Sequence, residues 1–162
     1  MSSLFPSAEE VRSVLATLLG KNVTVRSLPP GKPIAGAVFA AYGADDGPAS
    51  IVCVGDIGFA ANAGAALALM PAATAQECIG KGKLAGPLFE NVCEILNVCG
   101  QLLNRVPGQR IVLRSASDKL PDLPAEARGV LAAPTQRLDL SVEITGYGSG
   151  RIALQWKDLV QA

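Results

Sequence analysis

Apolar residues recur along the chain in two patterns, one typical of helices and one typical of strands. Spacings of three and four residues predict helices over 7–19, 58–70 and 86–104, with shorter helical segments at 74–82 and after Pro124. Alternating or continuous apolar runs, bounded by glycine, proline and polar clusters, predict strands at 22–28, 34–43, 49–56, 109–116, 136–144 and 151–159. The predicted order is a helix with three strands, a central helical region, and a second helix with three more strands.

The first predicted helix has recognisable signals at both ends. Ser7 stands at the position of an N-cap, and Glu10 three residues later gives the spacing of a capping box. Gly20 follows the last apolar residue, which is common where a helix ends in a left-handed turn. The sequence therefore predicts that this helix is capped at each end.

The two long helices share a local sequence pattern. When EVRSVLATLL (10–19) is aligned with EILNVCGQLL (94–103), both segments begin with glutamate, share a central valine and end with two leucines. The alignment also places Ser13 where the second helix has Asn97. Chance similarity between two amphipathic helices is the alternative explanation. As a repeat, the pattern predicts an α+β fold of two pseudo-repeated helix/three-strand units, with long antiparallel helices packed on a mixed, mostly antiparallel β-sheet.

Length, composition and charge narrow the class of protein. A chain of 162 residues with 49% hydrophobic residues is expected to form a single domain over 1–162. It has 14 Lys plus Arg against 14 Asp plus Glu, so no positive excess favours nucleic acid as a partner. The apolar span after Asp56 is too short and interrupted to cross a bilayer, and no basic run favours a membrane surface. The N-terminus has neither the basic start nor the apolar core of a signal peptide, so a cytoplasmic protein is expected.

Histidine is absent, and this absence limits the chemistry of the chain. It removes the commonest general base, the commonest zinc ligand and every triad that uses imidazole. The cysteines at positions 53, 78, 93 and 99 contain no CxxC pair, and we expect free thiols. A Ser or Cys nucleophile would need a lysine or an acid as its base, and no motif brings one together.

The helix predicted at 86–104 carries a continuous polar stripe. Its positions advance by four, three, four and three residues, which keeps them on one helical face: Glu90, Glu94, Asn97, Gln101 and Asn104. A solvated face without a function is one interpretation, since surface polar residues usually have no special role. Two features favour a surface that binds another protein. Asparagine is a middling helix former, and the acids have no Lys or Arg partner along the helix.

Four residues of this region resemble the signature of the CheC/CheX family, the response-regulator phosphatases of bacterial chemotaxis. The family signature is an Asp or Ser, a Glu four positions later, an Asn three positions further, and a Pro a little over twenty residues beyond it. The corresponding residues here are Glu90, Glu94, Asn97 and Pro121. The order of helices and strands and the doubled unit are also similar to this family.

The chain departs from the family pattern at two positions. Glu90 stands where the family has Asp or Ser. In the first helix, Ser13 follows Glu10 where a second active motif would carry Asn. The first motif is therefore degenerate, and the resemblance is to the single-site CheX type.

The resemblance implies a phosphatase that acts on the phosphoaspartate of a CheY-like response regulator. Asn97 would position the attacking water, while Glu94 would pair with a receiver lysine and dock the helix. Glu90 and Gln101 are the expected partner-binding residues. The receiver would supply the Mg²⁺ of the reaction, so the resemblance implies no cofactor and no metal site of the chain's own.

Two other functions stay open at this point. One is a non-catalytic CheX-like binding module for a receiver or for a motor or signalling protein. The other is an unrelated small α/β domain without a partner of this kind. An exposed strand edge could also pair across a twofold axis and form a homodimer.

Overall fold

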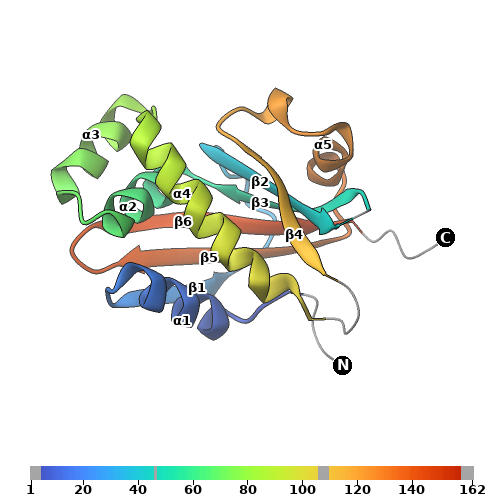
Figure 1. The fold of residues 1–162 in the computed structure, drawn as a ribbon, viewed down its shortest axis with the longest axis horizontal. Helices are drawn as coiled ribbons and strands as arrows, with labels where there is room; N and C mark the ends of the chain where they lie inside the picture. Colours follow the sequence, from blue (N-terminus) through green and yellow to red (C-terminus); the bar gives the residue numbers. More distant parts are fainter. Residues whose placement is uncertain (1–4, 46, 106–109, 158–162) are drawn as a thin grey trace.

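A six-stranded antiparallel sheet organises the chain (Figure 1). The computed structural model describes residues 5–45, 47–105 and 110–157. The strands are β1 (Val23–Leu28), β2 (Val38–Ala44), β3 (Ala49–Gly55), β4 (Ile111–Ser117), β5 (Gln136–Ile144) and β6 (Gly148–Trp156). The helices are α1 (Ala8–Leu19), α2 (Ile57–Leu67), α3 (Ala72–Lys81), α4 (Gly86–Cys99) and α5 (Ala125–Ala132), with 3₁₀ turns η1 (Gly100–Leu103) and η2 (Leu120–Asp122).

The strand order shows the predicted repeat. The order is β1-β5-β6-β3-β2-β4, so β1, β2 and β3 of the first unit occupy positions equivalent to β4, β5 and β6 of the second. The two units exchange their first strands: β1 pairs with β5, and β4 pairs with β2. The units meet at the central β3–β6 pair, where Cys53 lies opposite Leu154. The α+β class and the doubled unit are therefore confirmed.

Both faces of the sheet are covered where the central strands lie. Residues of β3 alternate between two cores: Ile51 and Cys53 belong to the larger core, whereas Val52 and Val54 belong to the smaller one. Helices α1, α2 and α4 cover the first face, as Figure 1 shows. Helix α5 contributes to the smaller core on the opposite face, where Val130 is buried.

The ends of α1 agree with the predicted signals. The Ser7 hydroxyl accepts a hydrogen bond from the Glu10 backbone N–H at 3.1 Å, and the Glu10 carboxylate accepts one from the Ser7 N–H at 3.0 Å. Gly20 adopts a left-handed conformation with φ of 64° and donates its N–H to the Ala16 carbonyl. The capping box and the glycine stop are confirmed.

Several sequence predictions need correction. Every strand pairing among the described residues is antiparallel, so the sheet is not mixed. The strand predicted at 34–43 begins only at Val38, and Ile34 before it packs on the smaller core. The short helical segment predicted at 74–82 is present, but it begins two residues earlier and forms the ten-residue helix α3. Residue 109 of one predicted strand and residues 158–159 of another lie outside the described residues.

Helices α2 and α4 pack so closely that their backbones are in contact at one point. A Cβ atom built on Gly64 of α2 would lie 2.7 Å from the Leu88 carbonyl oxygen of α4. The Asn91 side-chain amide donates a hydrogen bond to the Gly64 carbonyl at 3.0 Å. Helix α2 is rich in buried alanine and has a glycine at this point. These small side chains leave room for α4 to pack closely against α2.

We expect Gly64→Ala to destabilise the protein, because its methyl group must displace the backbone of α4. The free energy of unfolding in urea should fall by roughly 1–3 kcal/mol, the usual cost of overpacking a core. Gly80→Ala is the matched control, since Gly80 also lies within a helix but has nothing within 4 Å of a built Cβ. That variant should gain about 0.5–1 kcal/mol. Equal effects at the two sites would contradict the proposed contact.

Candidate functional site

The candidate site lies on α4, whose inner face fixes its position. The helix starts after Ala85, which makes no side-chain capping bond, and a proline stands in its first turn. Its buried residues are Leu88, Val92, Ile95 and Leu96. Their spacing of four, three and one residues gives a continuous apolar face, so burial of this face determines which side of α4 meets solvent.

The C-terminal end of α4 is anchored to the sheet. The Tyr42 hydroxyl of β2 donates a hydrogen bond to the Leu96 carbonyl at 2.7 Å in the core. Burial raises the pKa of Tyr42 well above its ordinary value, so the hydroxyl keeps its proton and remains a donor. A Cβ on Gly100 would lie 3.2 Å from the Tyr42 ring, so the glycine lets η1 pass closely over it. Asn97 follows directly after this anchored carbonyl.

Most of the polar stripe is exposed and unpaired. Glu90, Glu94, Asn97 and Gln101 are all exposed. Their side chains make no hydrogen bond or ion pair with any residue that the structure describes. Asn104 differs, because its amide oxygen accepts the Ile111 N–H at 2.6 Å and its amide nitrogen donates to the Ile111 carbonyl at 3.3 Å. Asn104 therefore holds the start of β4, and the first four residues of the stripe form the accessible surface.

The equivalent positions on α1 are arranged differently. The Glu10 carboxylate, which also closes the capping box, accepts a hydrogen bond from Arg105 Nη1 at 2.8 Å. The hydrogen bonds from Arg105 and from the Ser7 backbone lower the pKa of Glu10 to about 2. Ser13 is exposed but carries no amide. Glu10 thus joins α1 to the end of α4, whereas Glu94 is left without a partner among the described residues.

The loop after β4 carries the proline of the predicted signature. Burial, followed by the negative charges of Asp118 and Glu90, raises the pKa of the Cys93 thiol on α4. Pro121 of the predicted signature lies in η2 and is exposed, and Leu120 beside it is 41% exposed.

The described residues were also compared with the requirements of a metal site, a membrane-spanning helix and a ligand cavity. Within residues 5–45, 47–105 and 110–157, no group of three or more Cys, Asp or Glu side chains is arranged to hold a metal ion. No helix in these ranges is long and apolar enough to cross a bilayer. A cavity of about 30 Å³ beneath α4 and η1 is lined by core residues such as Leu15 and Phe59. It has room for about one water molecule and none for an organic ligand.

Comparison with known proteins identifies the fold. No protein-family model matches the chain, and no curated protein matches it by sequence. The FliM middle domain from H. pylori and a chain of the FliG–FliM complex from H. pylori each match 93% of this chain with a TM-score of 0.64 and 11% identity, over 84% and 86% of their own lengths. A chain of the CheX–CheY–BeF3–Mg²⁺ complex from Borrelia burgdorferi matches 93% of this chain and 94% of its own length, with a TM-score of 0.57 and 12% identity. The predicted resemblance is confirmed as one of fold.

The Glu10–Arg105 pair predicts a pH-dependent contribution to stability. Because the folded-state pKa of Glu10 is lowered from 4.5 to about 2, its contribution is present above pH 4.5 and disappears as the pH falls toward 2. Glu10→Gln should lower the urea midpoint at pH 7, and the difference from wild type should shrink over that range. Glu94→Gln removes an acid without a described partner and should leave the midpoint unchanged. A Glu10→Gln effect that is independent of pH would contradict this assignment.

Proposed function

We propose that the chain is a CheX-like phosphatase that removes the phosphoryl group from the phosphoaspartate of a CheY-like receiver. The observation that carries the proposal is the pair Glu94 and Asn97, exposed one turn apart on a helix that is anchored at both ends. The fold supports it, because the CheX–CheY complex is among the structures that match. Neither side chain is used for internal contacts within the described residues.

An exposed amide suits the hydrolysis of an acyl phosphate. Such a phosphate is already reactive, and its loose transition state requires a positioned water and stabilised charge more than a strong base. The Asn97 side chain offers one acceptor and two donor hydrogens, so it can orient a water without removing a proton. Because Asn97 follows the anchored Leu96 carbonyl, its backbone is held in place while its side chain faces outward.

The surrounding residues provide the docking contacts of this proposal. Glu94 pairs with a lysine of the receiver, and Glu90 and Gln101 extend the contact along α4. The receiver supplies Mg²⁺, which neutralises phosphoryl charge at the junction of the two proteins. Glu90 and Glu94 lack intramolecular partners among the described residues, so docking breaks no ion pair of theirs.

Asn97→Ala should reduce receiver dephosphorylation by on the order of a hundredfold, because the water loses its positioning group. The measurement is the loss of the phosphoryl group from a phosphorylated receiver of the same organism. Ser13→Ala, at the equivalent exposed position on α1, should leave the rate unchanged. Urea unfolding should show both variants to be as stable as wild type. Equal rates for wild type and Asn97→Ala would exclude the catalytic assignment.

The second candidate function is a non-catalytic binding module. It is favoured by the matches to the FliM middle domain and the FliG–FliM complex, whose TM-scores exceed that of the CheX–CheY match. Binding of the receiver with no acceleration by the wild type would support this function instead. Glu94→Lys should then weaken binding at least tenfold, because a like charge would face the receiver lysine.

A further inference from the structure

The outer face of β1, β5 and β6 carries a row of polar residues. The strand pairing places Arg26 of β1 opposite Ser141 of β5, and Ser141 opposite Arg151 of β6. Residues directly opposite on neighbouring strands have Cβ atoms about 4.5–5.5 Å apart. The flanking positions 140 and 142 are buried in the larger core, so the three side chains point to the other face of the sheet.

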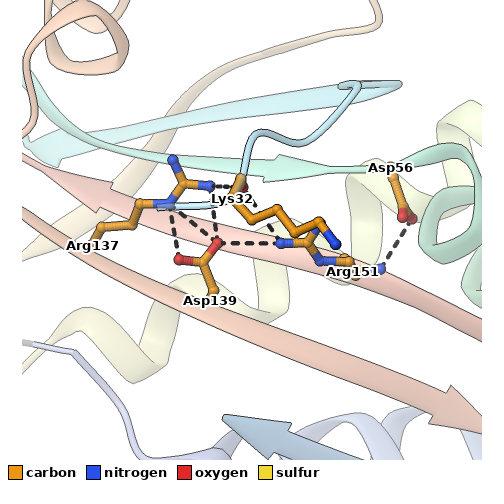
Figure 2. A network of polar contacts seen from close by, with 5 residues as sticks. All are labelled: Lys32, Asp56, Arg137, Asp139 and Arg151. Atoms are coloured by element: carbon orange, nitrogen blue, oxygen red, sulfur yellow. Dashed lines mark hydrogen bonds and ion pairs between the residues drawn. The ribbon is translucent and has the colours of Figure 1, made fainter. Parts of the chain in front are cut away.

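The two arginines next to Asp139 are used differently, as Figure 2 shows. Arg137 makes bidentate contacts of 2.9–3.1 Å with the buried Asp139 carboxylate and donates to the Lys32 carbonyl at 2.7 Å. Arg151 reaches the same carbonyl at 3.4 Å and Asp139 at 3.8 Å, in both cases through Nη2. Its buried Nε has no hydrogen-bond partner among the described residues. Arg137 thus neutralises Asp139, and most of the donor capacity of Arg151 is unused.

Arg151 lies in a surface groove that has one apolar wall and one basic wall. One part of the groove, of about 500 Å³, is lined by Leu28, Pro29, Pro30, Lys32, Ser141 and Arg151. An adjoining part of about 180 Å³ shares Ser141 and is lined by Thr24, Arg26, Glu143 and Ser149. Figure 2 shows the Lys32 side chain extending alongside the Arg151 guanidinium.

The charges of the groove are unbalanced. Arg26, Lys32 and Arg151 are opposed by Glu143, which lies in the neighbouring row of the sheet. Arg137 and Asp139 cancel each other below the surface. A concave site with excess positive charge and hydroxyl donors is complementary to an anion with several oxygens, because guanidinium groups bind such anions in a fork.

We propose that this groove binds a small phosphate-bearing molecule. Arg151 and Lys32 hold the phosphate from one side, Arg26 approaches it from the other, and Ser141 donates a hydrogen bond from the floor. A phosphate satisfies these donors better than a carboxylate, because its oxygens point in several directions. The site lies on the face of the sheet opposite α4 and is independent of the proposed phosphatase function.

Inorganic pyrophosphate is the probe, titrated by calorimetry at constant ionic strength. Wild type should bind one equivalent, and Arg151→Gln should weaken binding at least tenfold, as expected for loss of a charged hydrogen-bond donor. Arg26→Gln should also weaken it, and the fold should be unaffected because this exposed side chain makes no hydrogen bond or ion pair with a described residue. Lys83→Gln, which removes an exposed positive charge elsewhere, should bind like wild type.

Glu143→Gln provides a test that misfolding cannot imitate. Removing the opposing carboxylate should tighten pyrophosphate binding about twofold, the size expected for one charge at several ångströms in water. Absence of saturable binding by wild type would overturn the proposal, as would equal affinities in wild type, Arg151→Gln and Arg26→Gln. Binding only to vesicles of anionic phospholipid, with none to pyrophosphate, would overturn the assignment to a small molecule.

Discussion

The backbone contact between α2 and α4 at Gly64 sets the position of the helix on which the proposed function depends. A helix that buries Leu88, Val92 and Ile95 against a neighbour this close has little freedom to roll about its axis. The Tyr42 hydroxyl adds a second attachment at the other end of α4. Rigid placement of the inner face determines which residues face outward. The geometry of the polar stripe is therefore a consequence of core packing on the opposite side of the same helix.

The two equivalent helices of the doubled unit use their glutamates differently: the one on α1 makes contacts within the fold, and the one on α4 faces solvent. Glu10 and Glu94 occupy equivalent positions on the helices that precede β1 and β4. Glu10 completes a capping box and pairs with Arg105, so its charge contributes to the fold. Glu94 has no such partner in the described chain, so its charge remains available to another molecule. Ser13 carries no amide at the position equivalent to Asn97, so α1 does not present a second pair of glutamate and asparagine.

Local signals in the sequence predicted a large part of this arrangement. Periodicity and capping residues identified α1, α4 and most strands, because these elements depend on neighbours within a few positions. The exposed stripe followed from helical spacing, whereas the hydrogen bonds of Asn104 did not, since its partner Ile111 belongs to another element. The antiparallel pairing of every described strand depends on contacts between distant segments, which one sequence does not specify. The Arg26, Ser141 and Arg151 row required the strand register for the same reason.

The two proposed surfaces lie on opposite faces of the sheet, so a ligand in the groove and a receiver on α4 would not compete for space. They share a structural support at Asp56, which follows β3. One oxygen of its carboxylate accepts the Arg151 backbone N–H at 3.0 Å and the Phe59 N–H at 2.9 Å, which joins β6 to the start of α2. Helix α2 in turn packs against α4 at Gly64. This connection ties the groove and the polar stripe to the same core, so the two proposed surfaces are supported by shared packing.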